Sequence, residues 1–162
     1  MLINNGIVTC FAYGQTGSGK TFTMNALQEL VVNEMFEQIK NKFTVTVSFF
    51  EIYGTKCLDL LNDKQALDIL EDKSNTIQIQ GLTEKEAGDA KELLAIMSAA
   101  NSARTTHATA ANDTSSRSHA ICQIILKKGG SDVGKLLLVD LAGSERAQDT
   151  QSNNRQRRME GA

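Results

Sequence analysis

Apolar positions near the start of the chain predict a strand, a turn and a helix in close succession. Residues 6–14, GIVTCFAYG, form a nearly continuous apolar run closed by glycine, which is the pattern of a strand buried on both faces of a parallel sheet. Residues 20–40 contain no glycine, and apolar side chains recur there every three or four positions, as on one face of an amphipathic helix. These side chains are Met24, Leu27, Val31, Met35 and Ile39.

The next part of the chain predicts further strands. Residues 43–54 alternate at first and then become wholly apolar, so they predict a second strand. Residues 57–62 and 76–82 are two shorter strand candidates, and the polar, acidic stretch 63–75 between them predicts a hairpin-like excursion.

A second helix is predicted to begin near Asp89, because Asp89 and Glu92 have the spacing of a capping box. An apolar stripe continues this helix to about residue 104, through Leu93, Met97 and Ala100. A third long helix is not evident in the pattern.

The last third of the chain predicts a long loop and a hairpin. Residues 104–119 have almost no large apolar side chain, and small hydroxyl residues favour local bonds over helix or sheet. Residues 120–128 and 135–143 read as two strands joined by a turn over 129–134, as in an antiparallel hairpin. The alternation of strands and helices predicts an α/β fold with a mixed central sheet flanked by helices.

Composition narrows the class of protein. At 162 residues the chain has the length of one domain, and its net charge of −2 provides no global attraction to nucleic acid or to an anionic membrane. The 3 cysteines lie in apolar stretches without metal-ligand spacing, which suits buried free thiols in a reducing compartment. No apolar run approaches the roughly 20 residues that span a bilayer, so we expect a cytoplasmic protein.

The stretch GQTGSGKT, residues 14–21, carries the most specific chemical signal. Gly14, Gly19, Lys20 and Thr21 fit the phosphate-loop pattern G-x-x-x-x-G-K-[ST], between a predicted strand and a predicted helix. Backbone amides freed by glycine, the positive end of the helix dipole and the Lys20 ammonium favour bound phosphates, and the Thr21 hydroxyl can ligate Mg²⁺. The alternative interpretation is an ordinary strand-to-helix turn. The remaining predicted nucleotide-contacting positions of this loop are Gln15, Thr16, Gly17 and Ser18.

Two distant segments could complete such a site. Asp140 ends an apolar strand, where a carboxylate can hold a water of the magnesium shell, and Gly143 places a bare backbone amide near a terminal phosphate. Taken alone, a strand ending in aspartate is a weak signal. Within the loop at 104–119, residues 115–118 offer hydroxyls and one guanidinium, and Arg117 could pair with Glu145 when the loops close. A solvated serine-rich loop is the alternative interpretation. His107 and His119 lack a metal-ligand pattern, so each is expected to be a hydrogen-bonding histidine.

Four stretches, in this order, resemble the motor domain of a kinesin: FAYGQTGSGKT, FFEIYGTKCLDLLND, NDTSSRSH and VDLAGSER. NDTSSRSH fits the family's switch I pattern, and DLAGSE fits switch II. The stretches LDLLNDKQALDILED and DTQSNNRQRRMEGA resemble the microtubule-depolymerising kinesin-13 subfamily more than the walking kinesins. The resemblance divides residues 1–162 into a phosphate loop (14–21), switch I (104–119), switch II (140–146) and a tail (147–162).

The resemblance implies an ATPase that uses ATP and ADP with Mg²⁺, binds microtubules and works in the cytoplasm on the cytoskeleton. It implies that Lys20 and the amides of residues 17–21 bind phosphates, and that Phe22 stacks on the base. Magnesium would be held by Thr21 and Ser116, with Asp140 on its water shell. Asn112 and Ser115 would contact the nucleotide or the attacking water, and Gly143 would sense the terminal phosphate. Arg117 and Glu145 would form a closing bridge, with Glu145 accepting a proton through water.

The resemblance also implies that this is an incomplete motor core, since a kinesin motor is about twice as long. We therefore expect residues 8–13 to form an exposed sheet edge that invites self-association. Lys64 is left as the main cation in a segment that lies near tubulin in the family. The alternative function is a truncated, non-motile module that binds nucleotide or tubulin without productive ATPase.

Overall fold

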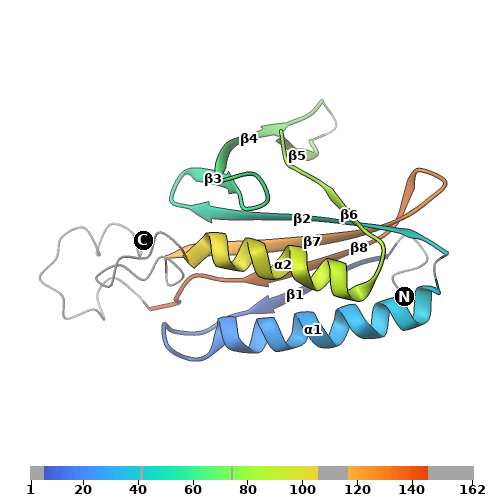
Figure 1. Cartoon of the computed structure of the whole chain (residues 1–162). Coiled ribbons are helices and arrows are strands. Elements are labelled where there is room, and N and C mark those ends of the chain that lie inside the picture. The colour runs from blue at the N-terminus through green and yellow to red at the C-terminus, as the bar shows by residue number, and fades with distance from the viewer. Residues whose placement is uncertain (1–5, 41, 74, 106–116, 146–162) are drawn as a thin grey trace, which may run out of the picture.

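A computed structural model describes residues 6–40, 42–73, 75–105 and 117–145 (Figure 1). The tail at 147–162 and most of the switch I segment lie outside the described residues. In chain order the elements are β1 (Gly6–Ala12), α1 (Lys20–Ile39), β2 (Thr44–Tyr53), β3 (Lys56–Asp59), β4 (Gln65–Glu71), β5 (Ile77–Gln80), β6 (Lys85–Ala87), α2 (Ala90–Thr105), β7 (Ser118–Lys128) and β8 (Ser131–Asp140). The predicted α/β class is confirmed.

The strands form one mixed sheet in the order β1-β8-β7-β2-β3-β4-β5, with β6 paired to β2. Only β1 and β8 run parallel among the described pairs, and the others are antiparallel. The predicted hairpin of β7 and β8 is confirmed, although its turn is shorter than expected. Gly129 and Gly130 have φ angles of 59° and 83°, which is the backbone of a tight two-residue hairpin turn, so β8 begins at Ser131.

Both helices pack on the same face of the sheet, side by side (Figure 1). The buried stripe of α1 includes Met24, Met35 and Ile39, as predicted, while Leu27 and Val31 are only half-buried. Gln28 and Val32 take the buried positions between them. The stripe is therefore rotated by about one residue in the middle of the helix, where α1 faces α2 as well as the sheet.

The predicted start and core face of α2 are confirmed. The backbone amide of Glu92 donates to Asp89 Oδ1 at 2.8 Å, and the Glu92 carboxylate in turn accepts from the amide of Gly88 at 2.8 Å. The first bond satisfies an amide that the helix itself leaves open, and the second holds the chain just before the helix. Leu93, Met97 and Ala100 are at most 1% exposed.

A second, smaller hydrophobic cluster is formed by strands β2, β3 and β4, around Phe50, Cys57 and Leu67. The hairpin-like excursion predicted over residues 63–75 agrees with the structure, but it contains a strand that was not predicted, because β4 occupies most of that stretch and pairs antiparallel with both β3 and β5. Only Leu67 of β4 is buried. The other apolar residues of the strand, Ala66, Ile69 and Leu70, are exposed, so backbone pairing with β3 and β5 positions β4 more than burial does. The three-residue strand β6 was not predicted either.

The prediction that the first strand is buried on both faces was wrong. Within the described residues β1 has β8 as its one neighbour, so its other edge is open, as the resemblance led us to expect. Cys10 and Ala12 pack toward the helices, whereas Ile7 and Phe11 are 70% and 62% exposed. Both helices lie on the face of Cys10 and Ala12, and an apolar run signals a strand without reporting whether both of its faces are covered.

The predicted free thiols agree with the structure. Cys57 and Cys122 are buried, Cys10 is half-buried, and all are free. No helix in the described part of the chain is long and apolar enough to cross a membrane.

Candidate nucleotide site

The phosphate loop connects the end of β1 to the start of α1. Gly17 and Gly19 have φ angles of 80° and 84°, a region that side chains disfavour, which explains glycine at these positions. Gly19 is the N-cap of α1 and makes no side-chain capping bond. The first turn of a 20-residue helix therefore presents amides without a side-chain cap, which is the arrangement that binds anions.

Lys20 spans this loop. Its ammonium donates to the backbone carbonyls of Gly14 and Gln15 at 2.8 and 2.9 Å. The positive charge is therefore held over the loop in the same place as the positive end of the helix, and both attract phosphate.

The parallel pairing of β1 with β8 brings Asp140 to the phosphate loop, because Asp140 lies opposite Ala12 in the register. The Thr21 hydroxyl donates to Asp140 Oδ2 at 2.7 Å. Asp140 is 4% exposed, and its other oxygen, Oδ1, has no hydrogen-bond partner among the described residues. A buried carboxylate oxygen without a donor is costly unless an ion or its water completes it, so these two residues fit a Mg²⁺ ion with its water shell.

Residues 141–145, which follow β8, run back along the phosphate loop. The Ser144 amide donates to the Gly14 carbonyl at 3.1 Å, and the Glu145 carboxylate accepts from the amide of Thr16 at 3.0 Å and from the Thr16 hydroxyl. A side chain at Gly143 would overlap the Glu145 carboxylate and the Thr16 hydroxyl. Glycine at this position therefore permits the close approach of switch II to the loop.

The electrostatics of Glu145 follow from these contacts. Partial burial acts to raise the pKa of its carboxyl group, but the bonds from Thr16 and the charge of Lys20 outweigh it, and the pKa lies below its ordinary value. The carboxylate is therefore ionised at neutral pH. An anion already lies against the loop that would bind phosphate.

Arg104, at the C-terminal end of α2, is part of this site and was not predicted to be. It is 3% exposed, and its Nη1 lies 2.7 Å from Asp140 Oδ2. Its Nη2 donates to the Ser118 carbonyl at 2.8 Å, and its Nε approaches the Ser118 hydroxyl at 3.4 Å. The helical stripe through Met97 and Ala100 reaches residue 104 at the next turn, so the spacing did place an arginine on the buried face.

The structure describes only some of the other predicted site residues. His119 accepts a bond from the Ala142 amide at 3.1 Å, which confirms a hydrogen-bonding histidine and ties β7 to switch II. Phe22 is 82% exposed at the start of α1. Arg117 is half-buried next to Ser118, and its pairing with Glu145 stays a prediction. The loop residues Asn112, Ser115 and Ser116, and His107, lie outside the described residues.

Lys64 was predicted to be the main cation facing tubulin, but the structure gives it an internal role. Its ammonium lies 3.1 Å from the buried carboxylate of Glu51 and 3.3 Å from the Arg104 carbonyl. Only 16% of the Lys64 side chain is exposed. The charge is thus largely used within the protein, beside the end of α2.

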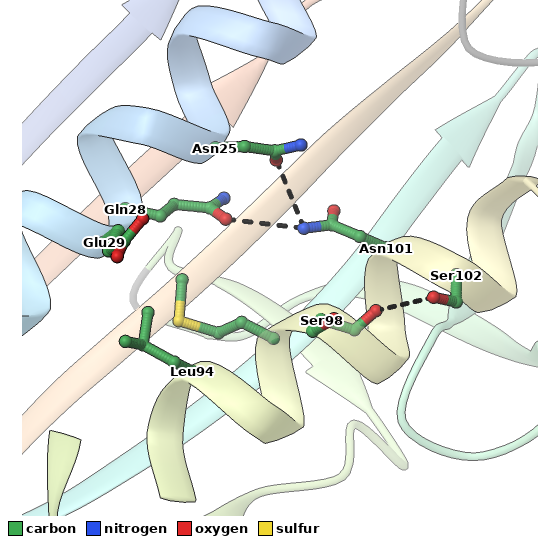
Figure 2. A pocket seen from close by; sticks show the side chains of 8 residues that line it. Asn25, Gln28, Glu29, Leu94, Ser98, Asn101 and Ser102 are labelled. Atoms are coloured by element: carbon green, nitrogen blue, oxygen red, sulfur yellow. Dashed lines mark hydrogen bonds between the residues drawn. The ribbon is translucent and has the colours of Figure 1, made fainter. Parts of the chain in front are cut away.

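An open groove of about 560 Å³ separates α1 from α2 (Figure 2). Asn101 donates across it to Asn25 and Gln28 at 3.3 and 3.4 Å, and Ser102 donates to the Ser98 carbonyl within α2. None of the phosphate-loop residues lines this groove. It is therefore distinct from the candidate nucleotide site. The described residues also contain no cluster of three or more His, Cys, Asp or Glu side chains that could hold a metal.

Comparisons with known proteins agree with the geometry. The family model of the kinesin motor domain matches residues 2–162. A relative from Cylindrotheca fusiformis, the diatom spindle kinesin-1, is 48% identical over 161 residues, which is 97% of this chain and 26% of the relative. The chain thus spans about a quarter of that relative's length. Neither comparison is specific to the kinesin-13 subfamily. Because the motor-domain model matches nearly the whole sequence, this chain belongs to the kinesin motor-domain family.

Proposed function

We propose that this chain is the ATP-binding and ATP-hydrolysing core of a microtubule-associated kinesin motor, working on the cytoskeleton. The observation that carries the proposal is the pair of Thr21 and Asp140 at the end of the phosphate loop. The Thr21 hydroxyl bonds to one carboxylate oxygen, while the second oxygen is buried and has no partner among the described residues. An ordinary strand-to-helix turn does not account for a buried carboxylate left in this way.

Different residues of the chain bind the phosphates, the base and the metal. The amides of residues 17–21 and the Lys20 ammonium hold the phosphates, and exposed Phe22 offers a ring for the base. Thr21 and Ser116 would hold Mg²⁺, and Asp140 would accept from the ion's water shell. When bound, Mg²⁺ neutralises charge on the phosphate oxygens. Membership of the kinesin family supports ATP and ADP as the nucleotides, with Mg²⁺ as the metal.

Hydrolysis depends on the two switches. Glu145 is ionised and accepts a proton through water, while Asn112 and Ser115 contact the nucleotide or the attacking water. Gly143 reports the terminal phosphate through its backbone amide, in a position where a side chain would collide with Thr16. Arg117 pairs with Glu145 when the loops close and so excludes water from the site.

A nucleotide- or tubulin-binding module without productive ATPase is the alternative, and Glu145 is the observation that favours it. In this structure the proposed proton acceptor lies on the phosphate loop. A depolymerising activity of the kinesin-13 type rests on sequence resemblance in residues 58–72 and in the tail. Shortening of stabilised microtubules on addition of protein and ATP would test that finer assignment.

Two measurements test the proposal together. One is the binding of a fluorescent ADP analogue in the presence of Mg²⁺, and the other is the ATPase rate with and without microtubules. Lys20→Ala removes charge-assisted bonds worth about 1.5 to 3 kcal/mol each, so nucleotide affinity should fall by roughly 10-fold or more. Lys42→Ala, which changes an exposed lysine beyond α1, is the control and should bind like the wild type. Equal affinity of Lys20→Ala and wild type would refute the phosphate-loop assignment. Binding without hydrolysis, at any microtubule concentration, would favour the alternative.

A further inference from the structure

The last strand of the sheet, β5, has an open edge. Among the described strands it pairs with β4 alone, and the β4–β5 hairpin lies at the opposite end of the sheet from β1 (Figure 1). The backbone groups on its outer side therefore have no strand beside them in that part of the chain. Edge strands are commonly protected by lysine, proline or a bulge. The strand IQIQ contains neither of these residues, and its register with β4 is regular.

Two aspartates hold β5 in its extended form. Asp72 accepts from the Thr76 amide at 3.0 Å and from the Gln78 side chain at 3.1 Å, just before and within the strand. Beyond the other end, the fully buried Asp59 accepts from the Thr83 amide at 2.8 Å. The strand is therefore fixed at both ends while its edge is open, so a partner that pairs with it does not first have to order it.

One face of the hairpin carries apolar side chains out to this edge. The register places Ile69 opposite Ile79 and Glu71 opposite Ile77, and residues paired in this way project to the same face. Ile79 packs on the second hydrophobic cluster, next to Leu67, whereas Ile69 and Ile77 are 48% and 61% exposed. The cluster thus continues into an exposed apolar strip, which consists of Ile69, Ile77 and Ile79.

The charges around the apolar strip are mainly acidic. Residues 65–80 contain three acidic side chains and one basic side chain, which are Asp68, Glu71, Asp72 and Lys73. Asp68 and Glu71 are exposed on β4, one on each face of the hairpin, because they lie three positions apart in a strand. Both faces beside the open edge therefore favour a partner with basic side chains.

We propose that the edge of β5 is a docking site for a short extended segment of another protein, in which apolar side chains alternate with lysine or arginine. The segment adds to the sheet as a strand beside β5. Its backbone pairs with the open edge, its apolar side chains cover Ile77 and the rest of the apolar strip, and its cations lie in the field of Asp68 and Glu71. The 4-residue length of β5 suits a short segment better than a second sheet. This site is independent of the proposed nucleotide site.

A synthetic peptide of about six residues, in which valine alternates with lysine, is a suitable probe for such a strand. Labelled with fluorescein, it should bind the chain saturably, as measured by fluorescence anisotropy. A valine–glutamate peptide should bind at least about tenfold more weakly because its charge is reversed, and so should a valine–lysine peptide with a central proline, which cannot complete the ladder. Equal binding of all three peptides, or none by the first, would overturn the proposal.

Two pairs of variants locate the binding. Ile77→Thr keeps a β-branched side chain but shortens the apolar strip, and Glu71→Lys reverses a charge near the edge. Each should weaken binding of the valine–lysine peptide by about two- to fivefold. Leu30→Thr and Glu37→Lys make the same kinds of change at exposed positions of α1 and should bind the peptide like the wild type. Equal effects in variants and controls would indicate unspecific attraction and overturn the site.

Amide hydrogen exchange on the unaltered protein tests the pairing itself. Residues 77–80 should exchange more slowly when the valine–lysine peptide is bound, because their outward amides gain partners. Unchanged exchange there in the bound state would overturn edge pairing. Loss of microtubule binding in Ile77→Thr would assign the strip to tubulin, and reduced self-association in that variant would assign it to a second copy of the chain. Either result would also overturn the proposal.

Discussion

The carboxylate of Glu145 accepts hydrogen bonds from both the backbone amide and the hydroxyl of Thr16, which lies 129 positions earlier in the chain. Thr16 is one of the phosphate-loop residues, so a carboxylate uses a donor that an incoming phosphate could use. The charge of Lys20 contributes to holding the carboxylate there. Switch II and nucleotide are thus expected to compete for part of the same loop.

Glu145→Gln should therefore separate binding from hydrolysis. Charged acceptors make hydrogen bonds about twice as strong as neutral ones, so the amide would hold Thr16 less tightly and release it to the nucleotide more easily. We expect nucleotide affinity to rise by roughly two- to tenfold, corresponding to about 0.5 to 1.5 kcal/mol. Hydrolysis should fall by about 10²- to 10⁴-fold because the proton acceptor is lost. Equilibrium binding and single-turnover ATPase assays measure the two effects.

The pH dependence gives a control for the same variant. The folded-state pKa of Glu145 lies below its ordinary value of 4.5, so the contribution of the Thr16 contact is present above that value and is lost as pH falls through the lower folded-state pKa. Between about pH 6 and 8 the ratio of wild-type to Glu145→Gln affinity should stay constant. Glu37→Gln, an exposed change on α1, should bind nucleotide like the wild type. Weaker binding by Glu145→Gln would contradict the competition.

Lys64 should affect stability more than microtubule affinity. Glu51 is buried, with 2% of its side chain exposed, and its Oε2 has no partner within the described part of the chain. Removing Lys64 leaves an uncompensated buried carboxylate, for which the usual cost is about 3 to 5 kcal/mol. Lys64→Met should lower the free energy of unfolding by that order, measured by urea titration.

The double variant Lys64→Met with Glu51→Gln should recover much of the lost stability, because no buried charge then remains unpaired. Lys56→Met, which removes an exposed lysine of β3, should leave the unfolding midpoint near the wild-type value. A stable Lys64→Met protein with strongly reduced, salt-dependent microtubule binding would instead restore the interpretation of Lys64 as a tubulin-facing cation.

The three cysteines should react very unequally. Burial raises the pKa of Cys122 to about 12, and burial together with the nearby Asp59 charge raises that of Cys57. Thiolates are the reactive form, so a disulfide reagent at pH 8 should label half-buried Cys10 in the native protein and all 3 thiols after denaturation. Fast native labelling of Cys122 would show that β7 opens locally.

The Cys122 thiol should also make the folded protein less stable at alkaline pH. Its folded-state pKa is raised, so the contribution of neutral Cys122 is complete below its ordinary value of 9.0 and is lost as pH rises from there toward about 12. Cys122→Ala should therefore show a weaker loss of stability over that interval than the wild type. Parallel unfolding curves for the two proteins across this pH range would contradict this assignment of the alkaline loss.

Much of the fold was predictable because its signals are local. The stripe of Leu93, Met97 and Ala100 and the capping pair at Asp89 fixed α2, and two adjacent glycines after residue 128 marked the hairpin turn. The strand β4 was missed since its register comes from backbone pairing with β3 and β5, and only Leu67 is buried. The burial of β1 was misjudged because it depends on neighbours that an apolar run does not specify.

Only part of the candidate site was predictable from the sequence, as with the fold. Gly17, Gly19 and Lys20 carry a motif whose chemistry needs those residues at that spacing, so the loop could be recognised from sequence. The contact of Arg104 with Asp140 could not, because the helical spacing places Arg104 on the buried face but does not specify its partner. Its partner Asp140 lies 36 positions away, and only the tertiary fold, which packs α2 beside α1 on the sheet, brings them together.

The open edge of β1 gives a last prediction, for a protein consisting of residues 1–162 alone. The strand GIVTCFA carries no charge, its free edge offers unpaired backbone groups, and Ile7 and Phe11 are exposed beside it. Such an edge pairs readily with another copy, so light scattering should show oligomers that increase with concentration. Phe11→Lys should suppress them, because a charge on an edge strand opposes pairing. Leu30→Lys, at an apolar position of α1 that is 67% exposed, is the control. Equal suppression by both variants would point to general apolar contact, and a monodisperse wild-type monomer at high concentration would contradict edge pairing altogether.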